Sequence, residues 1–344
     1  MIQCLNRTDT TEAFMIDRRR KWHRRFLAFC IFLFMWMFPV LSMSQEYPTR
    51  PINLLVGFVP GGAVDPTLRI LAAKAGKILG QPFVISNNGG GGGSVALGIT
   101  ANAKPDGYHL VGCAGPGLVW VPHFQNVSYK LEDFVFVMHY GAPYTGLAVK
   151  ADSPFKTMKD LVEYAKKNPG KVTYSTTGVG TPMHVSMEFV AKQESLEWTH
   201  IPYKGNGPAL TALLGGHVTA QIGGPEQMPH IQSGAIRLLA IHTEKRRKIL
   251  PNVPTFKELG YDFVTEAVFM VAAPKGTPLP FVNKLDDALH KAMEEPEFIK
   301  LMENMGMEIT YRNAADLKKY LEDADARAQK LGQDLKIQPQ AEAK

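Results

Sequence analysis

The feature that most constrains the fold is a recurring order of segments: a short apolar run, a glycine-rich loop, and a stretch with apolar residues at helical spacing. The first example has its apolar run at residues 52–58, then the loop VPGGAV, then a helical stretch that Gly80 is expected to end. Later apolar runs lie at residues 171–175, 199–203, 217–222, 236–242 and 268–274. Strands that alternate with helices in this way predict an α/β fold with parallel sheets.

Three helix starts can be predicted from local residue types. Asp65 is expected to be an N-cap, with Pro66 as the first helical residue. Thr157 and Asp160 have the spacing of a capping box, and Thr181 followed by proline is expected to open another helix. Beyond about residue 275 the pattern is mainly helical.

Residues 1–44 differ from the rest of the chain. A block rich in Arg and Lys at residues 18–25 precedes the apolar run FLAFCIFLFMWMFPVL, and SMSQ follows with small residues at the −3 and −1 positions. This order is typical of a signal peptide, with cleavage expected after Ser44 and with either Met1 or Met15 as the start. We therefore expect an exported chain.

Charge and cysteine content limit the function classes. Without residues 1–44 the chain has 31 basic and 29 acidic residues, a net charge of +2 compared with +6 for the full sequence. This balance gives no support to nucleic-acid binding. Only Cys113 remains of three cysteines, so we expect no internal disulfide. The remaining 300 residues are enough for two domains.

The run of five glycines at residues 89–93 raises the question of a nucleotide site. A P-loop would require Lys followed by Ser or Thr, and here Ser94 and Val95 follow instead. A dinucleotide fold would accept Gly91, Gly93 and Ala96, but it lacks the acidic residue about 20 positions later. We therefore expect no nucleotide cofactor.

Four other loops follow predicted strands: PGGA from Pro60, STTGVGT from Ser175, KGNGP from Lys204 and GGPE from Gly223. Ligands of α/β proteins bind at the carboxyl ends of strands, and helix N-termini there favour anions. Lys204 is the only basic residue in these loops, so a multiply charged phosphate would be poorly neutralised. A small carboxylate, held by a few N–H and hydroxyl donors, fits better.

A series of motifs resembles one known family, the substrate-binding proteins of tripartite tricarboxylate transporters, also called Bug-type receptors. The motifs occur in the family's order: YPTRPINLLVGFVPGGAVD, NNGGGGGS, KPDGYHL, TYSTTGVGTPMH, IPYKGNGPALTALLGGHV, RLLAIHTEKR and LPNVPTFKELGY. The resemblance covers almost all of the chain after the signal peptide.

The resemblance implies a type II periplasmic binding protein fold, in which two α/β domains joined by two crossover strands close over a carboxylated ligand. We place the first crossing near residues 147–150 and the second near residues 269–272. Residues 45–147 and 270–344 would then form domain 1, and residues 148–269 would form domain 2. It also implies a monomeric periplasmic receptor that delivers its ligand to the permease subunits of a transporter.

The family's ligand loops can be carried over residue by residue. They imply a site made by Phe58, Gly61, Gly62 and Ala63 of domain 1 with Thr176, Thr177, Gly178, Gly180, Thr181, Gly205 and Gly224 of domain 2. Backbone N–H groups and threonine hydroxyls would hold one carboxylate. The glycine run would start a helix near the cleft. His184 is expected to be a buried structural residue.

Departures from the family bear on the ligand. Many members carry an Asp in the loop that corresponds to GGPE, where it can meet an amino group, and here only Glu226 is near. An amino acid is therefore a less expected ligand than a di-, tri- or aromatic carboxylate. Trp120, Tyr140 and Tyr144 could widen an apolar pocket, or they could belong to the core or the rim.

Two other readings stay open at this point. A secreted hydrolase would need a nucleophile and a base, yet GxSxG is absent and Cys113 has no evident partner. His184 and Glu188 stand one helical turn apart, which is too common a spacing to predict a metal site. We therefore expect no catalytic residues and no metal. A receptor could also report to a sensor kinase instead of a permease.

Overall fold

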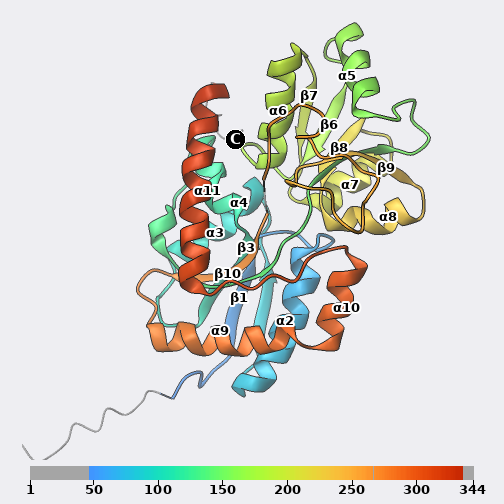
Figure 1. Ribbon diagram of the computed structural model, residues 1–344. Helices are drawn as coiled ribbons and strands as arrows, with labels where there is room; N and C mark the ends of the chain where they lie inside the picture. Colours follow the sequence, from blue (N-terminus) through green and yellow to red (C-terminus); the bar gives the residue numbers. More distant parts are fainter. Residues whose placement is uncertain (1–45, 266, 336–344) are drawn as a thin grey trace, which may run out of the picture. The chain divides into compact units, whose positions relative to one another are not determined.

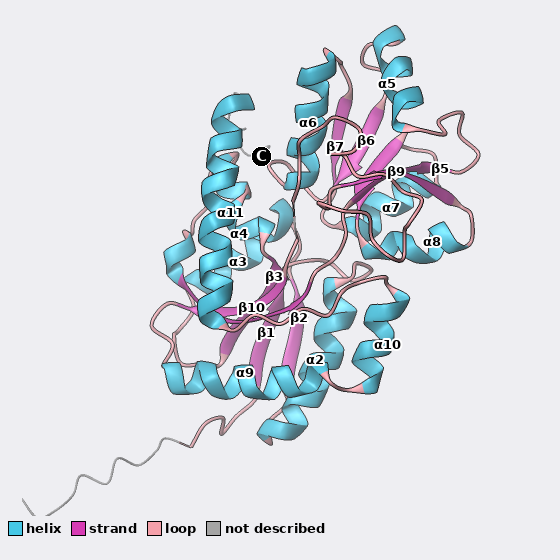
Figure 2. Ribbon diagram, viewed as in Figure 1, coloured by secondary structure: helices cyan, strands magenta, loops and turns pink. Residues whose placement is uncertain are grey.

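Two five-stranded sheets, each covered by helices on both faces, form the part of the chain that the structure describes (Figures 1 and 2). The structure is a computed structural model that describes residues 46–265 and 267–335. The predicted signal peptide at residues 1–44 lies outside these residues. Contacts group residues 48–344 into one unit, and the account below concerns that unit.

The first sheet has the strand order β2-β1-β3-β10-β4. Its strands are β1 (Ile52–Val56), β2 (Phe83–Asn87), β3 (His109–Ala114), β4 (Phe134–Gly141) and β10 (Phe269–Pro274). One face packs against α2 (Val64–Leu79), α9 (Leu279–Met293) and α10 (Pro296–Asn304). The other face packs against α3 (Ser94–Ala101), α4 (Pro116–Val119) and α11 (Ala314–Leu335).

The second sheet has the order β7-β6-β8-β5-β9. Its strands are β5 (Gly146–Lys150), β6 (Thr173–Thr176), β7 (Thr199–Pro202), β8 (Ala220–Gly223) and β9 (Ile236–Ile241). The helices α5 (Met158–Lys167) and α6 (Pro182–Glu194) cover one face. The helices α7 (Asn206–Leu214) and α8 (Met228–Gln232) cover the other.

Both sheets are mixed, which corrects the expectation of parallel sheets. Strand β10 pairs antiparallel with β3 and β4, and β5 pairs antiparallel with β8 and β9. Each is the first strand formed after the chain passes from one sheet to the other, through residues 142–145 and again through residues 242–268. The predicted crossings near residues 147–150 and 269–272 thus fall inside β5 and β10. A strand that follows a direct crossing does not need the helical connection that makes neighbours parallel.

The predicted helix starts are partly confirmed. Thr157 accepts from the Asp160 N–H at 3.2 Å, and Asp160 accepts from the Thr157 N–H at 2.9 Å, which completes the capping box of α5. Thr181 is the N-cap of α6. The prediction for Asp65 was wrong, because α2 begins at Val64 with Ala63 as its N-cap.

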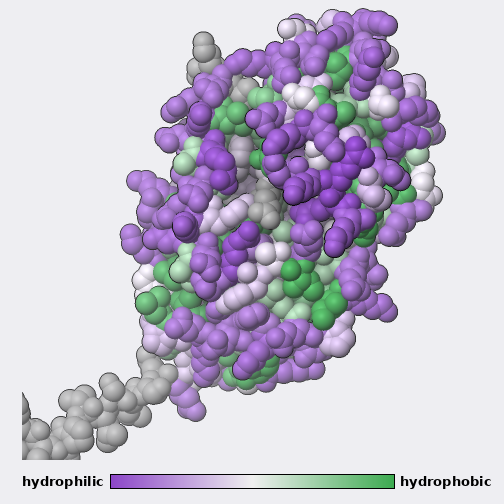
Figure 3. Space-filling view, in the orientation of Figure 1, coloured by the Kyte–Doolittle hydropathy of each residue, from purple (hydrophilic) through white to green (hydrophobic). Residues whose placement is uncertain are grey.

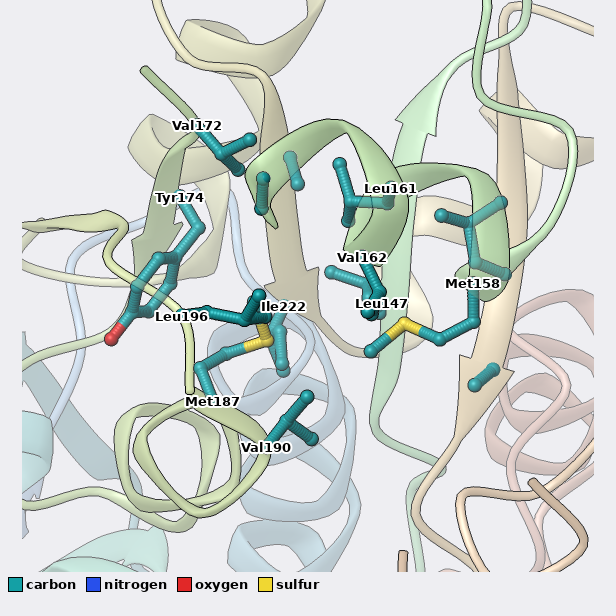
Figure 4. Close-up of a cluster of buried hydrophobic side chains, with 14 of the residues drawn as sticks. Leu147, Met158, Leu161, Val162, Val172, Tyr174, Met187, Val190, Leu196 and Ile222 are labelled. Carbon is teal, nitrogen blue, oxygen red and sulfur yellow. The ribbon is translucent and has the colours of Figure 1, made fainter. Parts of the chain in front are cut away.

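The core of the second sheet consists of the apolar faces of α5 and α6 against the strands. Leu161 and Val162 of α5, and Met187 and Val190 of α6, point toward Leu147 and its neighbours on the sheet (Figure 4). Hydrophilic side chains cover much of the visible face of the molecule (Figure 3). Among the helices of the described residues, none has both the length and the apolar character needed to cross a bilayer.

His242 is buried in an apolar surrounding where the chain leaves β9. Its ring lies 4.2 Å from that of Phe256 and 5.5 Å from that of Phe263, centre to centre, and neither ring nitrogen has a hydrogen-bond partner. Burial lowers the pKa of His242 to about 3. In the unfolded chain a histidine binds its proton below about pH 6.5, so His242 costs stability as the pH falls from about 6.5 toward 3.

Replacing His242 by leucine should therefore stabilise the protein in acid. We expect His242→Leu to raise the free energy of unfolding by about 2 kcal/mol at pH 5, because the unfolded variant no longer gains that proton. The difference should shrink at pH 8, where the wild-type ring is neutral in both states. Denaturant melts at the two pH values test this, and an equal effect at both would show that packing, not protonation, decides it.

Candidate functional site

A pocket opens at the carboxyl ends of strands from both sheets. The space between its lining residues is about 710 Å³, which includes the part open to solvent. The first sheet contributes the loop after β1, the glycine run and the loop after β3, and the second contributes the loops after β6, β7 and β8. The segments that pass between the sheets contribute Tyr144, Thr145, Thr265 and Ala267, and β10 contributes Phe269.

Six of the eleven predicted site residues line this pocket: Phe58, Gly62, Ala63, Thr177, Thr181 and Gly224. The other five, Gly61, Thr176, Gly178, Gly180 and Gly205, do not line it and lie next to residues that do. Gly205, for example, is the N-cap of α7 and directly precedes Asn206, a lining residue. The structure thus brings together the loops that were predicted to meet.

Two of the predicted donors are used inside their own loop. The Gly178 N–H donates to Thr176 Oγ1 at 3.1 Å, and the Gly180 N–H donates to His184 Nδ1 at 3.2 Å. The Thr181 hydroxyl in turn donates to the Gly178 carbonyl at 2.8 Å. The N–H groups of Gly178 and Gly180 hold the loop after β6 in shape, so they are not free to bind a ligand.

A buried aromatic stack supports the same loop. The His184 ring lies 4.2 Å from that of His200, which lies 5.0 Å from that of Tyr174, and His200 Nε2 is 2.7 Å from Thr176 Oγ1. Burial lowers the pKa of His184 to about 4 and that of His200 to about 3. Both rings are therefore neutral near pH 7, and His184 has the structural position expected of it. Glu188 accepts a hydrogen bond from Tyr174 at 2.6 Å.

Three helix N-termini open onto the pocket, those of α2, α6 and α7. The N-caps of α2 and α7 are Ala63 and Gly205, which have no polar side chain to cap the first turn. None of the described residues that line the pocket carries a charge. Uncapped N–H groups and the positive ends of helix dipoles are therefore the main electrostatic feature of the site, and they favour an anion.

Asp65 is kept away from this anion-favouring position. Its carboxylate accepts two hydrogen bonds from Arg69 Nε at 3.0 Å and one from Asn87 Nδ2 at 2.8 Å. Asn87 also donates to the Phe58 carbonyl at 2.9 Å. Asp65 thus fixes the loop after β1 from outside the pocket, which explains why it does not cap α2.

The glycine run reaches the pocket through Gly92. Residues Gly91–Gly93 form a short 3-10 helix before α3, and a side chain on Gly92 would lie 2.6 Å from Thr181 Cγ2. A side chain on Gly178 would lie 3.0 Å from the Gly92 nitrogen. The run therefore permits a close approach between loops of the two sheets, in addition to starting a helix beside the pocket as predicted.

The three aromatic residues left open by the sequence separate into two groups. Trp120 packs beside Phe263 in the interior, and Tyr140 is fully buried and within 3.3 Å of the Thr67 hydroxyl. Only Tyr144 lines the pocket. Sequence reasoning missed most of the pocket-lining residues in the two segments that pass between the sheets. The approximate positions predicted for the two crossings could have pointed to them.

Comparisons with known proteins agree with this geometry. Residues 67–337 match the family described as "Tripartite tricarboxylate transporter family receptor". A Cupriavidus necator protein named "UPF0065 protein in gbd 5'region" is 39% identical over 277 residues, which are 80% of this chain and 84% of that protein.

Two solved structures are similar over most of the chain. "Structure of periplasmic binding protein BugD" is 30% identical with a TM-score of 0.80, and "R. palustris Rpa4515 with adipate" is 30% identical with a TM-score of 0.79. Each match covers 86% of this chain and 100% of the other. They confirm the predicted type II periplasmic binding protein fold, and the description of the matching family names it a receptor. The chain therefore belongs to the receptor family of the tripartite tricarboxylate transporters.

Proposed function

We propose that this protein is a periplasmic receptor that binds a small carboxylate and delivers it to the permease subunits of a tripartite tricarboxylate transporter. The observation that carries the proposal is the pocket at the N-termini of α2, α6 and α7, which has no charged lining residue among those described. Such a site can hold one carboxylate by backbone N–H donors, whereas phosphates would need basic side chains. The Rpa4515 structure is named with adipate, which is a small carboxylate.

We propose that the carboxylate lies at the start of α2, near Gly62 and Ala63, and that Thr177 and Thr181 approach it from the loop after β6. Phe58 would pack against the carbon chain of the ligand. Gly178 and Gly180 would act indirectly, since their N–H groups hold the loop. Gly61 and Gly205 would position the neighbouring lining residues.

The rest of the proposal concerns how the receptor works. Export would depend on residues 1–44 as a cleaved signal peptide. Residues 45–147 with 270–344 would form one domain and residues 148–269 the other, with the ligand favouring a closed arrangement of a monomer that the permease recognises.

Thermal melts of residues 45–344 against a panel of compounds test the function. The panel contains mono-, di- and tricarboxylates, aromatic acids, amino acids, nucleotides and inorganic phosphate, and calorimetry follows each hit. A ligand at a hundredfold excess over its Kd should add about 2.7 kcal/mol to the free energy of unfolding. We expect stabilisation by carboxylates and not by nucleotides or phosphate; stabilisation by phosphate compounds alone would refute the proposal.

A further inference from the structure

The first sheet ends in an edge strand, β2, whose outer side is open. β2 lies beside α2 at the end of the strand order, and among the described residues only β1 pairs with its backbone (Figure 2). The Ile52 N–H of β1 donates to the Pro82 carbonyl at 3.0 Å, and the Asn88 N–H returns to the end of β1 at 2.9 Å. Since backbone groups alternate along a strand, the N–H and C=O groups of Phe83 and Ile85 point outward.

The other three sheet edges are protected. Residues 308–312 cover the carboxyl half of β4, and Ile241 of β9 exchanges hydrogen bonds with residues 254–256. β7 ends in Pro202, which stands at an outward position because the next residue, Tyr203, donates to β6. A proline there offers no N–H to an incoming strand.

β2 has none of the usual protections of an edge. Its sequence, FVISN, contains no proline and no charged residue, and its register with β1 has no bulge. An edge of this kind is a template for another extended chain. β2 therefore has the backbone of a docking site, and its two faces indicate what could dock there.

One face of β2 borders a groove. The side chains of Phe83 and Ile85 line it from the strand, and the space between all lining residues is about 990 Å³, which includes the part open to solvent. The helix α2 contributes a wall of small residues: Ala72, Ala73 and Gly76. Small residues leave room for the side chains of an added strand.

The groove carries positive charge. Its only charged lining residues among those described are Arg69 and Lys77, which are both basic. Arg69 is engaged by Asp65, whereas Lys77 is exposed and forms no ion pair with a described residue. The two acidic side chains at the start of α10 are already paired with Lys74. An acidic side chain would therefore complement Lys77.

The opposite face of β2 is apolar. A side chain on Gly57, just after β1, would lie 3.6 Å from Ala96 Cβ of α3, so this is the face that α3 covers. Because β1 and β2 pair in register and side chains alternate, Val84 points to the same side. Val84 is 51% exposed, and Val95 and Ile99 of α3 are 44% and 49% exposed. Exposed apolar side chains beside an open edge indicate a protein contact.

We propose that the edge of β2 docks an extended segment of a permease subunit, which adds a strand to the first sheet and alternates acidic with apolar side chains. The inference rests on the proposed function, which supplies the permease as the partner. The backbone of the segment would pair with Phe83 and Ile85, its acidic side chains would lie toward Lys77, and its apolar side chains toward Val84. A second copy of this chain would instead bring one basic groove against another.

Three labelled peptides of ten residues with blocked ends test the chemistry. The first alternates Glu and Val, the second alternates Lys and Val, and the third has the composition of the first with Glu and Val in separate blocks. Fluorescence anisotropy measures their binding to residues 45–344. We expect the first to bind about tenfold or more tightly than either of the others, and its lead over the Lys peptide to shrink with added salt.

Two variants locate the contact. Ile85→Pro removes an N–H that faces solvent and keeps the pairing with β1, so it should leave the melting temperature nearly unchanged and weaken the first peptide about tenfold. Ile85→Ala keeps the N–H and is its control. Lys77→Glu should weaken the same peptide, whereas Lys171→Glu, exposed before β6, should not. Neither Ile85 nor Lys77 lines the ligand pocket, so both variants should bind carboxylates as the wild type does.

Transport connects the peptide to the permease. In cells that carry the transporter, uptake of the best carboxylate of the panel should fall about tenfold with Ile85→Pro and much less with Ile85→Ala. Wild-type uptake with Ile85→Pro, or equal binding of the three peptides, would overturn the inference while carboxylate binding still supports the proposed function.

Two further outcomes would also count against the inference. Analytical ultracentrifugation could find a dimer that Ile85→Pro converts to a monomer, which would make a second copy the occupant of the edge. If no carboxylate stabilises the protein, the proposed function fails, and the permease fails with it as the source of the segment.

Discussion

Ala63→Asp should abolish carboxylate binding while the protein stays folded. Ala63 is the N-cap of α2, lines the pocket and leaves the first turn without a side-chain partner. An aspartate there would place a negative charge where we propose the ligand carboxylate lies, and like charges this close cost several kcal/mol. We expect Kd to rise about 100-fold or more, measured by calorimetry with the best ligand of the panel.

Ala63→Asn is the matched control, because asparagine has nearly the same size as aspartate and no charge. Neither side chain is expected to cap α2, because residue 63 has helical φ and ψ and the third helical residue, Pro66, has no N–H. Since the two side chains are nearly equal in size, the two variants should share any change in melting temperature. Asn should weaken binding much less than Asp. Equal losses in the two variants would mean that crowding alone acts, and tighter binding by the Asp variant would mean that the ligand end at α2 is a cation.

Much of the fold could be predicted because its signals are local. Gly80 ends α2 in the left-handed conformation, and Thr157 with Asp160 forms the expected capping box. Each of these features depends on residues within one or two helical turns. The loops after β1, β6, β7 and β8 were also placed correctly, since a strand followed by a helix defines its own loop.

The direction of β5 and β10 could not be predicted in the same way. Strand pairing is set by contacts between distant parts of the chain, and nothing within Gly146–Lys150 itself distinguishes a parallel from an antiparallel neighbour. Asp65 was misplaced for a related reason. Its carboxylate is held by Asn87, 22 positions away, as well as by Arg69, so a capping rule that considers only the residue types at the helix start missed these contacts.

The sequence predicted which loops come together at the candidate site, but not which atoms of those loops are free to bind a ligand. The sequence indicates that Gly178 lies in a ligand loop, but not that Thr176 Oγ1 occupies its N–H. It likewise places Glu226 near the cleft without revealing that Oε2 has no partner beside Gly224. The loop is set by chain order, whereas the free donors and acceptors are set by side-chain packing.

Gly207 lies in α7, but glycine is needed at this position for the contact between the loops of the two sheets rather than for the helix. A side chain on Gly207 of α7 would lie 2.8 Å from the carbonyl oxygen and 2.9 Å from the carbonyl carbon of Gly61 in the loop after β1. Backbone atoms cannot move aside as a flexible side chain can. Gly92 and Gly178 lie against each other in the same way. The loop after β1 therefore contacts α7 at close range, and the loop after β6 contacts the glycine run at close range.

Gly207→Ala should therefore weaken ligand binding without weakening the fold. Alanine suits a helix better than glycine, and position 207 has no left-handed φ, so α7 should be as stable as before or more so. The clash with Gly61 arises only where the two loops meet, and crowding of this kind costs about 1–3 kcal/mol. If the ligand binds the arrangement in which the two loops meet, its Kd should rise about tenfold or more, since a smaller fraction of the variant adopts that arrangement.

Calorimetry and thermal melts of the ligand-free protein together test this prediction. Thr211→Ala, one turn further along α7 and exposed, is the control and should leave the affinity unchanged. A loss of affinity together with an unchanged or higher melting temperature supports a role for Gly207 in closure. Wild-type affinity in Gly207→Ala would mean that the ligand does not need the Gly61 and Gly207 contact, and that closure over the ligand leaves these loops further apart.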